Sequence, residues 1–141
     1  MINVLKSFSY AKTDCRSRGG YLATPTTAAE NAMIADVITT NGTLTYWLDG
    51  DVEVGSSDPY WINIQLDKNN QPTKVLPFTN YYGTEPNDSL KKCVGILSAK
   101  NFKWGDRGCS YELPYVCAFY SKCEIFESIM VPYCLIELRA F

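Results

Sequence analysis

Six cysteines in a chain of 141 residues constrain the fold more than any other feature of this sequence. They are Cys15, Cys93, Cys109, Cys117, Cys123 and Cys134. So many cysteines in a small, aromatic-rich chain favour an oxidising compartment and a disulfide framework. No Cys-x-x-Cys pair occurs, which argues against thioredoxin-type redox chemistry and against zinc ribbons. Composition and spacing by themselves leave the pairing of the six cysteines open.

The composition excludes several classes of function. Histidine is absent, so the chain lacks the commonest general base, the commonest zinc ligand and every Ser-His or Cys-His nucleophile pair. No nucleophile motif or phosphate-binding loop replaces them, and we expect no enzyme. A net charge of −2 gives no reason to expect nucleic acid or an anionic membrane as partner. The length fits one domain with a substantial core.

The sequence also predicts where the protein works. Its first six residues lack an apolar core long enough for a signal peptide. N-glycosylation sequons nevertheless begin at Asn41 and Asn87, as in secreted glycoproteins. Asn41 is the better acceptor, because Pro86 restricts the backbone next to Asn87. We therefore expect a secreted, extracellular protein whose leader lies outside this sequence.

Two helices are expected near the start of the chain. The first covers residues 9–18, with Ser7 or Ser9 as its cap and a Gly-Gly pair as its stop. The second opens at the capping box that starts at Thr27 and runs to about Thr40. Its apolar positions indicate a packing helix without chemistry.

After residue 42 the apolar pattern changes from helical to strand-like. Short strands are expected at residues 44–48, 60–66, 75–79, 93–98 and 113–119. Asp49-Gly50 is interpreted as a turn that closes the first strand, and residues 67–73 as a loop. Two helices followed by several short strands predict an α+β domain.

Oxygen-bearing side chains gather in the stretch from Tyr81 to Asp88. Glu85 and Asn87 flank a proline there, and Asp106 follows further along the chain. Carboxylate and amide oxygens are the ligands that hard cations such as Ca²⁺ prefer. These residues therefore indicate a polar ligand loop on a disulfide-stapled scaffold.

An ordered set of short motifs extends from this stretch over most of the chain. It comprises the first helix with Cys15 and the following Gly-Gly-Tyr-Leu-Ala, Glu30-Asn31, Tyr46-Trp47-Leu48-Asp49-Gly50, Phe78-Thr79-Asn80-Tyr81, Glu85-Pro86-Asn87, Cys93, Trp104-Gly105-Asp106, Cys109 and Pro114-Tyr115-Val116-Cys117. In this order the motifs resemble the C-type lectin-like domain, over about residues 5–120. The resemblance implies a double-loop fold of two helices and short antiparallel strands, in a short form without an extra N-terminal cysteine pair.

The resemblance also implies a disulfide pairing and a domain boundary. It pairs Cys15 with Cys117 and Cys93 with Cys109. The lectin-like domain would occupy residues 1–120, followed by a C-terminal extension of unknown structure at residues 121–141. Within the extension, Cys123 and Cys134 either close a small extra loop or pair with another chain in a covalent homodimer. Its apolar run is too short and too charged to span a bilayer.

In sugar-binding members of this family, side chains hold a calcium ion, and the same groups bind sugar hydroxyls. Glu85 and Asn87 match the first two ligand positions, and Asp106 matches the last. The Glu-Pro-Asn pattern goes with mannose-type sugars. The resemblance therefore implies these three as the sugar-binding residues and as calcium ligands. To the calcium ligands we add Asp88, as a substitute for a family carboxylate that this chain lacks.

Two departures from the family pattern weaken the implied calcium site. Lys91 stands where the family has a carboxylate, which reverses the local charge at contact range. Gly105 stands where the family has an asparagine. Lys91 can form a salt bridge with Glu85 or Asp106 and take the place of the cation. Alternatively, Asp88 can take over the lost carboxylate position.

The sequence thus predicts a secreted carbohydrate-recognition protein that binds glycans, of the mannose type, through calcium. Pattern recognition of microbial or self glycans would be its setting. The alternative is a calcium-independent lectin-like module that binds a protein partner through the same loop edge, and Lys91 and Gly105 favour it.

Two further groups of residues are interpreted as structural. The three tryptophans, Trp47, Trp61 and Trp104, are expected in the core rather than stacked on sugar rings. The acidic residues between positions 49 and 58 are expected to form a solvated loop rather than an accessory calcium site.

Overall fold

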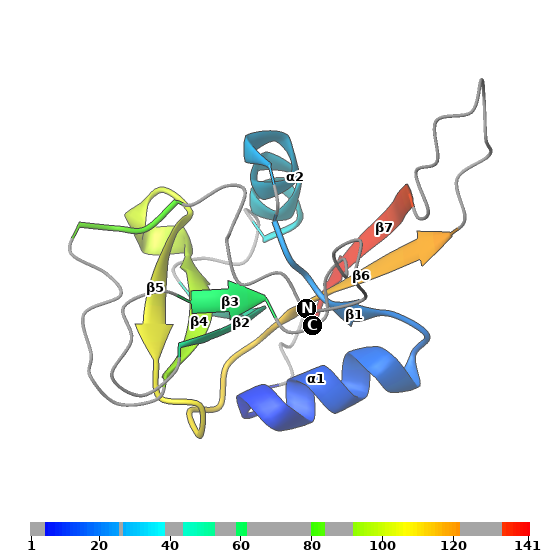
Figure 1. The fold of residues 1–141 in the computed structure, drawn as a ribbon, viewed down its shortest axis with the longest axis horizontal. Coiled ribbons are helices and arrows are strands. Elements are labelled where there is room, and N and C mark those ends of the chain that lie inside the picture. The colour runs from blue at the N-terminus through cyan, green and yellow to red at the C-terminus, as the bar shows by residue number, and fades with distance from the viewer. Residues whose placement is uncertain are drawn as a thin grey trace.

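The computed structural model of the chain describes residues 5–25, 27–38, 44–52, 59–61, 80–83, 92–121 and 134–141. Over these residues it has the α+β architecture that the sequence predicts, with two α-helices and two antiparallel sheets (Figure 1). In chain order the elements are α1 (Phe8–Ser17), β1 (Tyr21–Leu22), α2 (Ala28–Ile38), β2 (Thr45–Val52), β3 (Pro59–Trp61), β4 (Lys92–Leu97), the short 3₁₀ helix η2 (Ser98–Lys100), β5 (Lys103–Arg107), β6 (Val116–Ser121) and β7 (Cys134–Ala140).

Glycines end α1 as predicted, although the helix begins and ends one residue earlier than expected. Ser7 is its N-cap, without a side-chain capping hydrogen bond. Gly19 has a φ of +90°, which favours glycine, and the Gly20 N–H donates to the Cys15 carbonyl at 2.9 Å. A Cβ on Gly20 would lie 2.5 Å from the Ala118 carbonyl oxygen. The glycine therefore lets the chain pass close against β6.

The start of α2 confirms one of the two hydrogen bonds of the predicted capping box. The Thr27 hydroxyl accepts a hydrogen bond from the Glu30 backbone N–H at 3.1 Å. The buried residues Asn31, Ile34 and Ile38 fall on one face at helical spacing. This face packs inward, so α2 is the packing helix that the sequence predicts.

The two sheets are small, and backbone contacts join them. The first has the strand order β1-β6-β7, and the second has the order β3-β2-β4-β5. All pairings within them are antiparallel. Trp47 in β2 donates its backbone N–H to the Pro114 carbonyl at 2.8 Å, just ahead of β6. This contact aligns the sheets around a shared interior.

Among the residues that the structure describes, two clusters of buried residues form the core. The larger lies where α2 faces both sheets and contains Ala23, Ile34, Ile38, Tyr46, Leu48, Val94, Ile96, Trp104, Val116 and Ala118. The smaller lies around α1 and contains Phe8, Ala11, Cys15, Leu22, Trp47, Cys93, Tyr115 and Cys117. Each helix thus buries its apolar face against strands that are distant in the sequence.

Disulfides connect the elements as the resemblance implies. Cys15 in α1 bonds to Cys117 in β6, and Cys93 in β4 bonds to Cys109 just after β5. Cys123 and the side chain of Cys134 lie outside the described part of the chain. Their pairing stays a prediction.

The C-terminal residues extend the first sheet, a role that the sequence had left undefined. β7 pairs antiparallel with β6, and Phe141 exchanges backbone hydrogen bonds with Tyr115 at 3.1 and 2.8 Å. The two rings stack with centroids 5.6 Å apart. Leu138 and Ala140 pack against the larger cluster. The described part of the C-terminal extension therefore belongs to the folded domain.

The predicted turn at Asp49-Gly50 is wrong, because β2 continues through it. Trp47 pairs with Gly95, and Asp51 pairs with Cys93. Between these two pairs the chain advances four residues along β2 but only two along β4. The extra residues bulge out of the ladder, and the Asp49 N–H donates to the Ala23 carbonyl at 3.0 Å. Asp49 is fully buried, so the expectation of a solvated loop is also wrong at this residue.

Other strand predictions fall partly or wholly outside the described residues. β4 closely matches its prediction, whereas the last predicted strand begins three residues late, at Val116. β3 starts where a strand was expected, but residues 62–79 lie outside the described part. β5 was not predicted as a strand.

Candidate functional site

The candidate site is built on β5, which carries Trp104, Gly105 and Asp106. β5 pairs with β4, with Ile96 opposite Trp104 and Val94 opposite Asp106. The Trp104 ring is fully buried, and its indole N–H donates to the Asn31 side-chain oxygen at 2.7 Å. The start of β5 is thereby fixed to α2.

A short segment at residues 80–83 runs parallel to β5, along its outer edge. The Trp104 N–H donates to the Asn80 carbonyl at 2.8 Å, and the Tyr82 N–H donates to the Trp104 carbonyl at 2.9 Å. The Tyr81 ring meets Trp104 edge-on, with centroids 5.3 Å apart. We call residues 80–83 the approach segment, because Glu85 and Asn87 follow it in the sequence.

A strained turn supports both the approach segment and α2. Asn101 and Phe102 have φ angles of 55° and 60°, in the left-handed region that bulky residues avoid. Such a conformation costs about 1–3 kcal/mol per residue and persists only where neighbours fix it. The Phe102 carbonyl accepts hydrogen bonds from the side-chain amides of Asn31, at 3.3 Å, and Asn80, at 3.0 Å. These two asparagines hold the β4–β5 hairpin to its surroundings.

The sequence reasoning did not assign this role to Asn31 and Asn80. The available signal was the place of Asn31 on the buried face of α2, three residues before Ile34. A buried amide needs hydrogen-bond partners, so a polar residue in a packing face indicates a fixed contact. Asn80 carried no comparable signal, because its neighbours in the sequence show no regular period.

Asp106 is held in a rigid environment near the end of β5. Its exposed fraction is 6%, and Arg107 donates a guanidinium N–H to its backbone carbonyl at 2.7 Å. Cys93 lies opposite Arg107 in the ladder, and its disulfide to Cys109 closes this end of the hairpin. The Asp106 carboxylate is therefore carried on a fixed strand rather than on a loop.

The predicted ligand set is only partly within the described residues. Asp106 lies in β5, whereas Glu85, Asn87, Asp88 and Lys91 lie outside the described ranges. Within those ranges, no three Cys, Asp or Glu side chains come together so as to hold a metal ion.

Calcium needs six to eight oxygens. Gly105, next to Asp106, has no side-chain oxygen to offer. The described strand thus contributes one carboxylate, and further protein ligands would have to come from residues outside the described ranges.

The tryptophans that the structure describes have the packing role that the sequence predicts. Trp47 and Trp104 are fully buried, and the Trp47 indole N–H donates to the Lys6 carbonyl at 2.9 Å. The Trp61 side chain lies outside the described residues. Beside the approach segment, Tyr82 is 42% exposed, with the Lys100 ammonium 5.1 Å from its ring centre.

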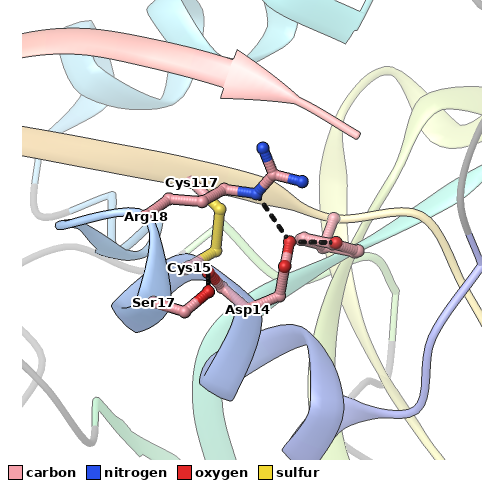
Figure 2. A network of polar contacts seen from close by, with 6 residues as sticks. Asp14, Cys15, Ser17, Arg18 and Cys117 are labelled. Carbon is pink, nitrogen blue, oxygen red and sulfur yellow. Dashed lines mark hydrogen bonds and ion pairs between the residues drawn. A yellow bond between two sulfur atoms is a disulfide. The ribbon is translucent and has the colours of Figure 1, made fainter.

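A second polar network lies at the end of α1, next to the Cys15–Cys117 disulfide (Figure 2). Arg18 donates to the Asp14 carboxylate at 2.9 Å, and the Tyr115 hydroxyl donates to the same oxygen. Desolvation raises the pKa of Asp14, but these hydrogen bonds and the Arg18 charge outweigh it, so the net pKa is lowered. Burial, together with the Asp14 contact, raises the pKa of Tyr115. The network ties α1 to the first sheet.

Comparisons with known proteins place these features in a family. The family model described as "Lectin C-type domain" matches residues 4–119. Collectin-10 of Xenopus tropicalis is 32% identical over 120 residues, which are 83% of this chain and 40% of the collectin. The chain thus spans less than half the length of that relative. Neither α1 nor α2, the α-helices of the described part, is long and apolar enough to cross a membrane.

Solved structures show the same fold at low sequence identity. A complex of SPL-1 with GlcNAc aligns with a TM-score of 0.65 and 21% identity, over 82% of this chain and 81% of that one. A calcium-independent type II antifreeze protein aligns with a TM-score of 0.63 and 21% identity, over 82% and 79%. Both carry the architecture described above.

Proposed function

Because this chain belongs to the C-type lectin domain family, we propose that it is a secreted carbohydrate-recognition protein that binds mannose-type glycans through the loop after Gly83. Members of this family are binding domains rather than enzymes. The two disulfides suit an extracellular protein. The sequons at Asn41 and Asn87, outside the described residues, leave glycosylation as a prediction.

One observation carries the proposal. The approach segment hydrogen-bonds along β5 in the parallel sense, so from Asn80 to Tyr82 the chain runs in the direction in which β5 runs from Trp104 to Asp106. A continuation in that direction would bring Glu85 and Asn87 toward the buried Asp106. A rigid carboxylate next to loop oxygens suits recognition of sugar hydroxyls, because the geometry is fixed before the ligand arrives.

Calcium is part of the proposal. Glu85, Asn87 and Asp106 would hold the ion, with Asp88 in place of the carboxylate that Lys91 replaces. A bound calcium ion has open coordination positions that neutral sugar hydroxyl groups can occupy. A sugar can therefore bind there without a large pocket in the protein. The GlcNAc complex of the structural neighbour SPL-1 supports a sugar as the ligand of this fold.

The test is retention of the oxidised protein on mannose and galactose resins, first in calcium and then in EDTA. We expect calcium-dependent retention on mannose, lost in Asn87→Ala and in Asp106→Asn. Glu112→Gln is the matched control for Asp106, because Glu112 is an exposed carboxylate outside β5. It should be retained like the parent protein. Lack of retention by the parent protein, together with no calcium-induced rise in melting temperature, would contradict the proposal.

The second candidate is a calcium-independent module that binds a protein partner through the same edge. Gly105 favours it, since this position offers no side-chain oxygen beside Asp106. The likeness to a calcium-independent antifreeze protein supports a member of this fold that functions without calcium. A melting temperature and tryptophan fluorescence unchanged by calcium, with no retention on either resin, would favour this candidate.

A further inference from the structure

β7 is the outermost strand of the first sheet, and it lies beyond the residues that match the family model. Among the described residues, its inner side pairs with β6 and no strand pairs with its outer side. An outer strand presents a row of backbone N–H and C=O groups that can pair with another strand. The register and the charges of β7 itself indicate which kind of strand would fit this outer side.

The hydrogen-bond pattern shows which backbone groups of β7 point outward. Tyr115 and Phe141 exchange both of their backbone hydrogen bonds, so they form a hydrogen-bonded pair. Such pairs alternate along an antiparallel ladder. In the register of β6 and β7, the next hydrogen-bonded pairs are Cys117 with Arg139 and Phe119 with Glu137. Leu138 and Ala140 therefore direct their N–H and C=O groups away from β6.

An independent contact agrees with this alternation. Val116 lies opposite Ala140 and should also direct its backbone groups away from its partner strand. The Val116 carbonyl does so, since it accepts the Ala23 N–H at 2.9 Å on the side of β1. The assignment of Leu138 and Ala140 to the outer edge is thus supported from the other side of the sheet.

The side chains of β7 divide into two faces. Leu138 and Ala140 pack toward the core, whereas Glu137 and Arg139 lie on the opposite face. Glu137 and Arg139 are 46% and 54% exposed and form an ion pair along the strand, with N–O distances of 2.7 and 3.0 Å. The outer edge of β7 therefore carries one acidic and one basic side chain, two residues apart.

We propose that this edge pairs with β7 of a second copy of the chain, antiparallel and with the two-fold axis at Leu138. In that register the outward backbone groups of Leu138 face those of Leu138 in the second copy. Glu137 of each copy then lies directly opposite Arg139 of the other. The same patch is used twice, as a two-fold dimer requires.

Neighbouring registers are disfavoured by charge. A shift of one residue would place outward backbone groups opposite inward ones, so the register can change only in steps of two. Such a step places Glu137 opposite Glu137 of the second copy, or Arg139 opposite its own counterpart. Like charges directly opposite one another destabilise a strand pair, whereas opposite charges stabilise it. Charged residues commonly block strand pairing, but this arrangement is self-complementary.

The test is the molar mass of the oxidised full chain, measured by sedimentation velocity up to about 0.5 mM, because a contact of this small area gives a weak dimer. We expect reversible dimer formation in the parent protein. Glu137→Arg and Arg139→Glu should each raise the dimer dissociation constant by about tenfold or more, since two cross-strand pairs become repulsive. The double variant E137R/R139E restores opposite charges in both places, and its dissociation constant should return to near that of the parent.

A backbone variant tests strand pairing separately from charge. Ala140→Pro removes an N–H that points away from β6, and proline is tolerated at such positions of outer strands. It should therefore abolish the dimer while the melting temperature of the monomer stays close to that of the parent. A parent chain that is monomeric at every concentration would overturn the proposal. So would a dimer that persists unchanged in both single charge variants, or one that is covalent on a non-reducing gel.

Discussion

At the scale of single residues, a few buried polar side chains position the candidate site. Asn31 is the clearest case, since it accepts from the Trp104 indole and donates to the Phe102 carbonyl. Through these contacts it connects α2 to the strand that carries Asp106 and to the strained turn before it. The geometry of the site thus depends on a side chain that would not contact the ligand.

Asn31→Ala should lower the free energy of unfolding by about 2 kcal/mol or more, because it removes a buried acceptor from the Trp104 N–H. Met33→Ala is the control in the same helix, since Met33 is 47% exposed, and it should change stability by about 0.5 kcal/mol or less. Urea denaturation followed by tryptophan fluorescence measures both. Equal midpoints for the two variants would show that the Asn31 contacts contribute nothing to stability.

The Asp14 carboxyl should make stability depend on pH in the acid range. Its folded-state pKa is lowered, so its contribution is fully present above the unfolded-state pKa, about 3.9, and is lost as the pH falls through the folded-state value. We expect the unfolding midpoint of the parent protein to fall more steeply below about pH 4 than that of Asp14→Asn. The measurement is urea denaturation at pH values from about 2.5 to about 7. Parallel curves for the two proteins would contradict this assignment.

At the scale of elements, β7 makes the C-terminal segment part of the domain. It pairs with β6 along its length, and Phe141 stacks on the buried Tyr115. The Arg18 guanidinium at the end of α1 lies 4.1 Å from the centre of the Phe141 ring. The segment therefore contacts both the first sheet and the end of α1.

Deletion of residues 134–141 should lower the free energy of unfolding by about 2 kcal/mol or more, because Leu138 and Phe141 lose their buried contacts. The double variant E137Q/R139Q is the control, since it keeps the strand and removes only an exposed ion pair. It should change stability by about 0.5 kcal/mol or less. Thermal and urea unfolding at low protein concentration measure both. A deletion variant as stable as the control would mean that β7 is dispensable for the fold.

The elements also show what the sequence could and could not predict. The two helices, the glycine stop of α1 and the packing role of Trp47 and Trp104 followed from local rules, because glycine stops, caps and apolar spacing act over a few residues. The continuation of β2 through Asp49-Gly50 did not, since a turn signal was overridden by pairing with Ala23 on a distant segment.

The predictions about the candidate site also divide into those that the local sequence supports and those that depend on distant contacts. The place of Asp106 near the end of β5 is in line with the Trp104-Gly105-Asp106 motif, whereas the roles of Asn31 and Asn80 depend on contacts over tens of residues. β7 was not predicted, because its partner strand β6 could not be assigned to it from the local sequence. Contacts of this range are set by the whole fold and leave only weak local signals.

At the scale of the whole molecule, the two disulfides in the described part of the chain act over very different lengths of chain. Cys15 and Cys117 are separated by 102 residues and join α1 to the central strand of the first sheet. Cys93 and Cys109 are separated by 16 residues and close the end of the β4–β5 hairpin next to Asp106. The first therefore constrains the fold as a whole, and the second constrains the site.

Removing each pair should separate these two effects. On the loop-entropy model, C15A/C117A should lose about 4–5 kcal/mol of stability and C93A/C109A about 3 kcal/mol. At a temperature where both variants stay folded, C93A/C109A should bind the ligand more weakly than C15A/C117A. The reason is that the Cys93–Cys109 disulfide holds the end of the strand that carries Asp106. Urea unfolding measures the first comparison, and retention on mannose resin in calcium measures the second. Weaker retention of C15A/C117A than of C93A/C109A, with both variants folded by circular dichroism, would contradict the assignment of the shorter disulfide to the site.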